Sequence, residues 1–434
     1  MLSEPEKSVQ ADKKRHGRIP GGGRFGTLRE HGENGGKGGE YMEGFRNEDI
    51  RFSVLKNKAY NMRWAEVPDG VIPLTAADTD FPPAPEIGQA LKAYIDEGYF
   101  PYVPKLGLPE FRESIARAVR ERKNEPVDPD LVLPVDSAAR GMYIIARAVL
   151  KPGDEAIIFD PVDFLFRESI LAAGGVPVLF PAGVSEGKWN LEALETYITP
   201  RTKMIGLCNP HNPLGMVYSR EELEHILKLS RKYGLWIMND EIWSDIIYED
   251  SRFTSILELP DTENVLTVYG FSKSFGIAGL RAGCIYAADR AAFDRVVEAS
   301  DVMTTAGGIS SLSQVAACAC LDRCYYWVDR FRKQLTENRD YVLKRMESMP
   351  GIRCHKPQAA FVLFPDITGT GMASEEFCRY LKENWRLAVV PGGQQYFGPG
   401  SEGHIRICIA TSHEILKEAM DRLEAGLRAL QARK

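Results

Sequence analysis

Four polar side chains follow apolar runs of strand length and carry the groups needed for one kind of chemistry. They are Asn212, Asp240, Lys273 and Arg281. A lysine in a packed loop bordered by glycines can form a Schiff base with an aldehyde when burial lowers its pKa. A carboxylate can keep a pyridine nitrogen protonated, an amide can donate to a ring oxygen, and an arginine with neighbouring hydroxyl groups can bind a phosphate. Together these groups predict a site for a phosphorylated pyridine aldehyde.

Each of these residues also has an ordinary structural explanation. Asn-Pro pairs form turns, an aspartate after a strand often caps the next helix, and a lysine between two serines is common in loops. Their combination in this order and spacing is much harder to obtain by chance. The sequence therefore predicts that the chain binds pyridoxal 5′-phosphate.

The apolar runs before these side chains predict the strands that position them. The runs are continuous rather than alternating, which is typical of strands buried on both faces of a parallel sheet covered by helices. They span residues 156–159, 176–180, 204–208, 235–238, 265–269 and 284–287. Helical patterns that precede or separate these runs span 86–98, 107–123, 138–150 and 220–233. Because ligand sites of parallel sheets lie at the carboxyl ends of the strands, we expect the four side chains to meet at one edge.

The chain beyond Ser310 has a different pattern. Long helices come first, followed by short strands around 360–364 and 404–409 and a final amphipathic helix. This mixture predicts a smaller α+β domain beside an α/β domain whose large, mostly parallel sheet lies between helices. The predicted divisions are a disordered, glycine-rich tail at 1–40, a segment at 41–85 that joins the small domain, a large cofactor-binding domain at 86–335 and a small C-terminal domain at 336–434.

The composition excludes several other classes of protein. Of the 434 residues, 44% are hydrophobic and 26% are charged, which is typical of a soluble globular protein. The net charge of −6 disfavours a nucleic-acid partner, and no apolar run approaches the roughly 20 residues that span a bilayer. The polar start at residues 1–9 is unlike a secretory signal, so we expect a cytoplasmic protein with reduced thiols and no membrane partner. Cys318, Cys320 and Cys324 lack a fourth ligand at a zinc-site spacing, so no metal is expected.

From about Asp78 to the C-terminus, the chain resembles the class I/II aminotransferases, the fold-type I pyridoxal-phosphate enzymes. The resemblance is carried by the motifs NPHNPLG at 209–215, NDE at 239–241 and GFSKSFG at 270–276, with an arginine eight residues after the motif's lysine. It covers most of the chain, and its motifs are specific as a set.

The resemblance implies a role for each polar side chain. Lys273 would form the Schiff base with the cofactor, as the internal aldimine, and would later move the proton at the substrate α-carbon. Asp240 would pair with the pyridine nitrogen, and Asn212 would pair with the ring oxygen. Arg281 and Ser272 would bind the phosphate.

Three further matches extend the resemblance. The backbone of Ala138 and Ala139, at a helix N-terminus, would bind the phosphate as it does in this family. Arg406, in the motif GHIRI at 403–407, resembles the arginine that binds the substrate α-carboxylate through a bidentate ion pair, with a surface salt bridge as the alternative. Tyr102 resembles the tyrosine that reaches the phosphate of the partner subunit, which implies a homodimer with shared active sites; core packing is the alternative.

Two departures from the family pattern affect the ring of the cofactor. Alignment from Pro161 puts Asp163 where an aromatic side chain usually stacks on the ring, and Phe164 comes next. Either Phe164 stacks after a shift of one residue, or an acidic group faces the ring. Trp243 stands where a tyrosine commonly donates to the ring oxygen, and an indole N–H can donate a hydrogen bond but cannot act as an acid.

The choice of reaction depends on the same positions. The chain is nearest to the branch that also holds cystathionine-type C–S β-lyases, which usually have an aromatic stacking residue and a histidine at the position of Trp243. Both residues are missing here, so amino transfer from an amino acid to a 2-keto acid is favoured over β-elimination. The two reactions share their first step, the removal of the α-proton by Lys273. A regulator that joins this fold to a DNA-binding domain is disfavoured, because the N-terminal segment is too short and glycine-rich for a helix-turn-helix.

Overall fold

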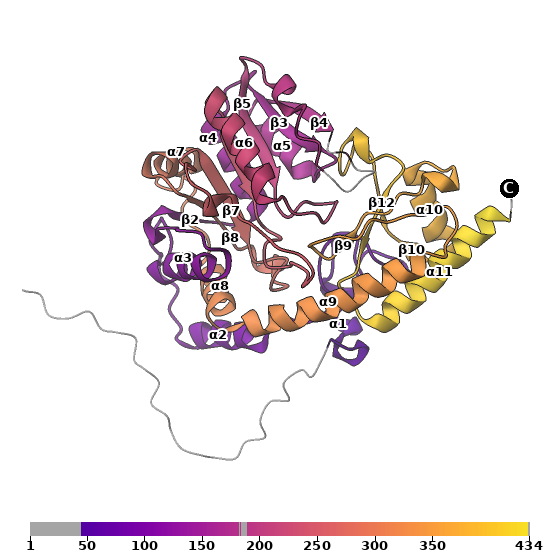
Figure 1. Ribbon diagram of the computed structural model, residues 1–434. Coiled ribbons are helices and arrows are strands. Elements are labelled where there is room, and N and C mark those ends of the chain that lie inside the picture. Colours follow the sequence, from indigo (N-terminus) through magenta and orange to yellow (C-terminus); the bar gives the residue numbers. More distant parts are fainter. Residues whose placement is uncertain (1–44, 182, 184–188, 433–434) are drawn as a thin grey trace, which may run out of the picture. The chain divides into compact units, whose positions relative to one another are not determined.

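A seven-stranded sheet forms the framework that positions the site (Figure 1). The computed structural model describes residues 45–181, 183 and 189–432, so the tail expected at 1–40 lies outside the described residues. The strands follow the order β2 (Val132–Val135), β8 (Gly283–Ala287), β7 (Val265–Gly270), β6 (Trp236–Asp240), β5 (Thr202–Cys208), β3 (Glu155–Asp160) and β4 (Val176–Pro181). Within this sheet, β8 is antiparallel to both of its neighbours and the other pairs are parallel. The predicted α/β class with a mostly parallel sheet is confirmed.

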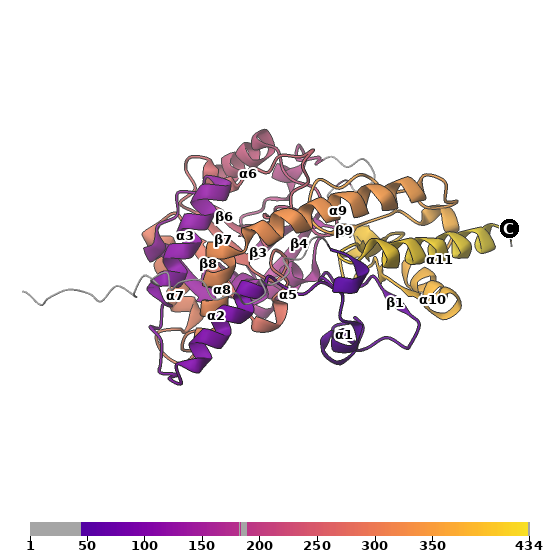
Figure 2. The same ribbon diagram turned by 90° about the horizontal axis from the view of Figure 1, so that it is seen from below.

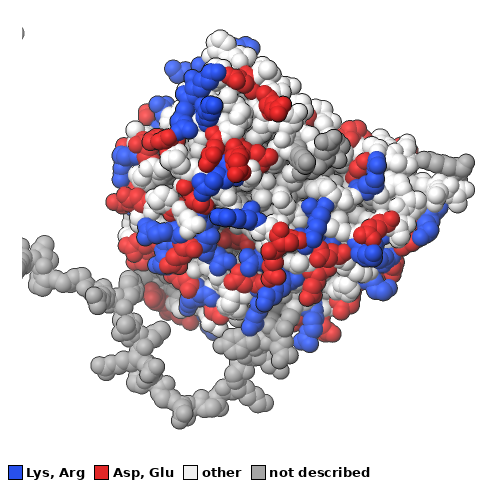
Figure 3. All heavy atoms as spheres, viewed as in Figure 1, with Lys and Arg blue, Asp and Glu red and all other residues white. Residues whose placement is uncertain are grey.

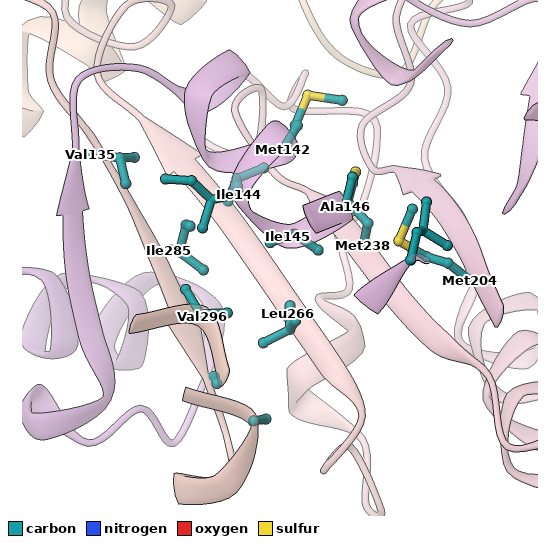
Figure 4. Close-up of a cluster of buried hydrophobic side chains, with 14 of the residues drawn as sticks. Val135, Met142, Ile144, Ile145, Ala146, Met204, Met238, Leu266, Ile285 and Val296 are labelled. Atoms are coloured by element: carbon teal, nitrogen blue, oxygen red, sulfur yellow. The ribbon is translucent and has the colours of Figure 1, made fainter. Parts of the chain in front are cut away.

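Helices cover this sheet and bury its apolar side chains. The helices α4 (Ala138–Val149), α5 (Phe164–Ala172) and α7 (Arg290–Ser300) share one hydrophobic core with the strands. Ile144 and Ile145 of α4 lie in that core with Leu266 of β7 (Figure 4). A fully buried side chain of this size contributes about 1.5–3 kcal/mol. A Cβ atom at Gly141 would lie 2.7 Å from Val268 Cγ1, so glycine lets α4 pack close to β7.

The remaining helices of this region form near the predicted positions. They are α2 (Pro85–Asp96), α3 (Pro109–Lys123), α6 (Arg220–Tyr233) and α8 (Ser311–Arg323). Both α2 and α3 pack against α8. At the start of α6, Ser219 Oγ accepts from Glu222 N at 3.2 Å, and the Glu222 carboxylate accepts from Ser219 N at 2.8 Å. This capping box stabilises the end where backbone N–H groups lack helical partners.

Strand β2 has no counterpart among the predicted strands. Its sequence contains Pro134, which cannot donate a ladder hydrogen bond and which argues against a central strand. The structure places β2 at the edge of the sheet, paired on one side with β8. A proline is tolerated there, because one side of an edge strand needs no partner.

The C-terminal part of the described chain contributes strands to two small sheets. The strands β9 (Val362–Leu363), β11 (Val390–Pro391) and β12 (Ile405–Cys408) pair antiparallel, with β12 in the middle. The other sheet pairs β1 (Ile72–Pro73) in parallel with β10 (Leu387–Ala388), so the segment near residue 72 joins the C-terminal elements. Figure 2 shows β1 near α10 (Ser374–Trp385); α1 (Phe52–Lys58) precedes β1 in the chain, and α11 (His413–Gln431) is the last helix of the described residues.

The division into a large and a small domain stays a prediction. The described residues belong to a single unit by their contacts. Helix α9 (Tyr325–Met346) runs without a break across the boundary expected at 335/336 (Figure 1).

A buried network of charges lies behind the carboxyl end of β6. Lys123, at the end of α3, donates to Glu241 Oε2 at 2.7 Å and lies 3.0 Å from Glu125 Oε1. Glu241 also accepts from Ser255 Oγ at 2.6 Å. Burial raises the pKa of Glu125 to about 8, and the Glu241 charge adds to this shift against the opposing effect of Lys123. The raised pKa favours the protonated form of the Glu125 carboxyl at neutral pH, and Lys123 lies against both carboxyl groups.

The raised pKa of Glu125 predicts a loss of stability as the pH rises from about 4.5 to about 8. The pKa is about 8 in the folded state against 4.5 as the ordinary value, so this contribution to stability is complete below pH 4.5 and is lost as the pH rises through 8. The free energy of unfolding should fall by up to about 1.4 kcal/mol per pH unit in this range. The substitution Glu125→Gln, which resembles the protonated form, should flatten the fall in Tm between pH 6 and pH 8.5 in scanning calorimetry. Glu249→Gln at an exposed position is the control, and equal pH slopes in all three proteins would contradict the assignment.

The surface charges, the helices and the metal-binding side chains of the described residues bear on the classes of protein considered above. On the face shown in Figure 3, Lys and Arg side chains are interspersed with Asp and Glu side chains. Among the described residues, no helix is both long and apolar enough to cross a membrane. The part of the chain that the structure describes also contains no group of three or more His, Cys, Asp or Glu side chains arranged to hold a metal ion.

Candidate active site

Three neighbouring strands end beside one another and bring the predicted side chains to one edge of the sheet. Cys208 at the end of β5 pairs with Asp240 at the end of β6, and Asp240 pairs with Val268 of β7. Asn212 lies four residues after β5, and Lys273 lies three residues after β7. An amide, a carboxylate and an amine therefore follow adjacent strands, at the position where ligands of parallel sheets bind.

The Lys273 amine is partly buried and contacts two segments that are distant in the sequence, the loop at Ala77 and the turn at Trp243. Its Nζ donates to the backbone O of Ala77 at 2.6 Å and lies 5.5 Å from the centre of the Trp243 ring. Burial lowers the pKa of Lys273, and the Arg406 charge lowers it further, against the opposing effect of Asp78. The neutral amine is therefore more populated than in an exposed lysine, and only this form can attack a carbonyl carbon or accept a proton.

The Asp240 carboxylate is buried at the end of β6. Its Oδ1 accepts from the backbone N of Ile242 at 3.0 Å. Burial raises the pKa of Asp240 to about 7, and the charges of Asp163 and Glu241 raise it as well, while Ile242 and Lys273 act in the opposite direction. A cationic partner would stabilise the charged form of this carboxylate.

A chain of hydrogen bonds joins Arg406 to Asp163 through the amide of Asn212. Arg406 Nη1 donates to Asn212 Oδ1 at 3.2 Å, and Asn212 Nδ2 donates to Asp163 Oδ2 at 2.7 Å. Arg406, on β12, also donates to the backbone O of Thr75 at 3.4 Å and lies 5.0 Å from the ring centre of Phe397. Burial lowers the pKa of Arg406. Its buried Nε atom has no hydrogen-bond partner in the described structure.

The start of α4 presents backbone N–H groups near the same edge. Ser137 caps the helix, since its Oγ accepts from the backbone N of Arg140 at 3.1 Å, which leaves the N–H groups of Ala138 and Ala139 at the helix end. A Cβ atom at Gly283 would lie 3.1 Å from Ala138 N, so glycine keeps this end close to β8. A helix N-terminus of this kind favours an anion.

Two further donors have open hydrogen-bonding capacity. Among the described residues, neither the Ser272 hydroxyl nor the Arg281 guanidinium has a hydrogen-bond partner. Arg281 is exposed and has a left-handed backbone with a φ of 50°. Such a conformation is uncommon for arginine and is found preferentially at functional positions.

Asp163, and not Phe164, contacts the assembled side chains. The Asp163 carboxylate is bonded to Asn212, whereas the Phe164 side chain is 38% exposed and its backbone N donates to Tyr396 O at 3.0 Å. Asp163 is the N-cap of α5, and this fixes the direction of its side chain. The described structure therefore brings the acidic group to the site and leaves Phe164 at the surface.

The two remaining aromatic residues differ in their surroundings. Trp243 is buried and packs edge-on against Phe361, with ring centres 4.7 Å apart. It also lies beside the Lys273 amine. Tyr102 is fully exposed, so within this chain it does not pack in the core.

Several residues around the site are not among the predicted site residues. The carbonyl of Ala77 holds the Lys273 amine, and a buried ion pair between Arg63 and Asp80 supports the same loop. Arg63 Nη1 donates to Ala76 O at 3.0 Å, and Trp64 Nε1 donates to Asp80 Oδ1 at 2.6 Å. No local pattern in the sequence indicated Arg63 or its pairing with Asp80.

Donors and acceptors at this edge fit a phosphorylated pyridine aldehyde. The N–H groups at the start of α4 and the open donors of Ser272 and Arg281 are groups that could bind the phosphate. The ring end has the buried Asp240 carboxylate, and the charge of the Lys273 amine interacts with both this carboxylate and the Arg406 guanidinium. Arg406 Nε remains as a buried donor for a further acidic group.

Comparison with known proteins gives consistent results. Residues 69–423 match the model of the family described as aminotransferase class I and II. The aspartate aminotransferase of Pyrococcus horikoshii is 33% identical over 363 residues, which cover 83% of this chain and 91% of the relative. The crystal structure of an aromatic aminotransferase from the same organism has a TM-score of 0.78 and 33% identity, and the match covers 86% of this chain and 98% of that one.

A lyase structure shares the fold at lower identity. Cystalysin from Treponema denticola, in a crystal structure that contains pyridoxal 5′-phosphate, has a TM-score of 0.81 and 23% identity, with 89% of this chain and 99% of that one covered. At this identity the likeness concerns the fold, so the aminotransferases carry the comparison. The resemblance read from the motifs is confirmed, and the chain belongs to the class I and II aminotransferases, enzymes of the transferase class that use pyridoxal 5′-phosphate.

Proposed function

We propose that Lys273 binds the cofactor aldehyde and moves the proton at the α-carbon of an amino acid. One observation carries this proposal: a partly buried amine with a lowered pKa follows the strand next to that of the Asp240 carboxylate. When bound, the cofactor supplies a ring that accepts the electrons of the substrate α-carbon. Lys273 supplies the base, and burial keeps more of it in the neutral form that accepts a proton.

Asp240 and Asn212 hold the ring in this proposal. The Asp240 carboxylate would accept a hydrogen bond from the protonated pyridine nitrogen. This cation would stabilise the charged form of Asp240, which burial disfavours in the protein alone. The Asn212 amide has two N–H groups and uses one for Asp163, so the other is available for the ring oxygen.

The phosphate is assigned to the donors at the start of α4. The backbone N–H groups of Ala138 and Ala139 face an anion at the helix N-terminus, and Ser272 and Arg281 add a hydroxyl and a guanidinium. This division leaves Arg406 for the substrate. Arg406 binds the α-carboxylate with its unpartnered Nε, and an arginine offers the planar, bidentate geometry that a lysine lacks.

Amino transfer to a 2-keto acid is favoured over elimination of a β-substituent. The family comparison favours it, and Trp243 offers no acid group beside Lys273, since an indole N–H does not release a proton. Lys273 is then the group that both removes and returns protons.

The reaction is tested by the visible absorbance of the loaded protein and its products. Amino acids would be added one at a time without a keto-acid acceptor. Loss of the visible band with stoichiometric keto acid would support the aminotransferase. A persistent band with continuing release of ammonia and pyruvate would support the β-lyase instead. No visible band after loading would contradict the role of Lys273.

We also propose that the protein is a homodimer with shared active sites. Tyr102 is fully exposed, and Tyr99 and Phe100 beside it are mostly exposed, which is unusual for aromatic side chains that face only water. Sedimentation equilibrium at micromolar concentration should give twice the chain mass. A monomer that retains cofactor and activity at this concentration would refute the assignment of Tyr102 to the partner's site.

A further inference from the structure

Asp163 is a charged group of the site that the proposed reaction does not use. Its Oδ2 accepts from Asn212 Nδ2 at 2.7 Å, and its Oδ1 accepts from the backbone N of Leu165 at 3.0 Å. Its backbone N donates to the backbone O of Asn212 at 3.1 Å. Two hydrogen bonds therefore hold the carboxylate in one direction at the start of α5, and a third fixes the backbone of Asp163.

Capping of α5 does not require a charge at this position. Serine, threonine and asparagine accept the same hydrogen bond from a helix, and a buried charge is unfavourable unless it is paired. Burial raises the pKa of Asp163, while Arg406 and Lys273 lower it through space. In the described structure, no basic side chain forms a direct ion pair with Asp163, so its charge acts on the site as a whole.

The distance from Asp163 to Arg406 is short because a single amide separates them. Arg406 Nη1 lies 3.2 Å from Asn212 Oδ1, and Asn212 Nδ2 lies 2.7 Å from Asp163 Oδ2. The oxygen and nitrogen of an amide are about 2.2 Å apart, so the carboxylate lies within about 8 Å of the guanidinium nitrogen. A group bound to Arg406 is therefore within range of the Asp163 charge.

The basic side chain closest to Asp163 in sequence does not offset this charge. Arg167, one turn along α5, donates to Glu168 Oε1 at 2.9 Å and to the backbone O of Gln394. Its guanidinium is thus already occupied by an acidic group and a carbonyl. Among the described residues, the electrostatic balance near Asp163 is set by Arg406 and Lys273 on one side and by Asp240 on the other.

We propose that Asp163 determines specificity by selecting against amino acids with a second carboxylate in the side chain. This inference rests on the proposed function, in which Arg406 binds the α-carboxylate and Lys273 faces the α-carbon. A side-chain carboxylate would add a like charge near Asp163, whereas a neutral side chain adds none. The protein should therefore prefer amino donors with neutral side chains, such as alanine, over aspartate.

The test compares ligands that differ by one carboxylate. The substitution Asp163→Asn removes the charge at nearly constant shape, and Asp163→Ser is a second variant that also retains a capping oxygen. The affinity of the loaded enzyme for succinate relative to propionate, measured by calorimetry, should rise about tenfold or more in both variants. The ratio of kcat/KM for aspartate to that for alanine should rise by a similar factor.

A matched control tests whether the effect depends on the position of Asp163 or only on the loss of one negative charge. Asp160, at the end of β3, accepts from the backbone N of Gly400 at 2.9 Å, so Asp160→Asn removes a nearby charge that does not contact Asn212. This control should leave both ratios unchanged. Equal changes for succinate and propionate in the Asp163 variants would overturn the inference. If neither amino donor reacts, the proposed function fails, and the two binding affinities still decide the role of Asp163.

Discussion

The substitution Lys273→Ala is expected to abolish amino transfer. In the proposed function the side chain supplies both the amine that binds the aldehyde and the base that moves the α-proton, so kcat should fall by at least about 10⁴-fold. The visible band of the lysine-bound cofactor should disappear after loading, because no other amine follows a strand at this edge in the described structure. Absorbance spectra and single-turnover keto-acid release measure the two effects.

The variant should remain folded. Burial lowers the pKa of Lys273, which means that the charged amine is disfavoured in the folded protein, so removal of the amine does not leave a stabilising charge unsatisfied. The Tm should therefore change little. Lys105→Ala, which removes an amine that donates to Met303 O, is the control for loss of a lysine elsewhere. A variant with an unchanged band and measurable turnover would refute the assignment.

The substitution Asp240→Asn is expected to give the second largest loss. An amide cannot hold the pyridine nitrogen in its protonated form, so the ring accepts electrons less readily, and kcat should fall by about 10²–10³-fold. The loss should appear mainly in kcat, because the substitution leaves the proposed contact of Arg406 with the substrate unaffected. Steady-state kinetics with a single amino donor separates kcat from KM.

The control for Asp240→Asn is an exposed aspartate with the same change. Asp261 has a left-handed backbone with a φ of 59°, a conformation that asparagine tolerates, so Asp261→Asn should leave kcat unchanged. An Asp240→Asn enzyme with the kcat of the unmodified protein would show that the carboxylate does not contact the ring.

The sequence predicted the parts of the fold that depend on local pattern. The strands that carry Asn212, Asp240 and Lys273 are continuous apolar runs, because both faces of the sheet are covered, and the structure has them within one or two residues of the expected ends. The edge strand β2 was not predicted, because Pro134 argues against a strand. The proline is tolerated only because β2 lies at the edge of the sheet.

Contacts between distant segments were not predictable in the same way. The pairing of Arg63 with Asp80 and the bond from Lys273 to Ala77 depend on how a loop without regular structure crosses the sheet edge. The orientation of Asp163 depends on the exact start of α5, and a shift of one residue would have exchanged it with Phe164. Local sequence patterns do not determine the first residue of a helix to within one position.

The small parallel pairing of β1 with β10 has a consequence for how the protein is made. The carbonyl of Thr75 accepts from Arg406, a residue 331 positions later, and β1 pairs with Leu387–Ala388. While the ribosome is still producing the middle of the chain, the segment near residue 72 has no partner strand. The nascent chain therefore contains Lys273 long before it contains Arg406, the residue proposed to bind the substrate α-carboxylate. A chain that stops before β12 would lack that proposed contact.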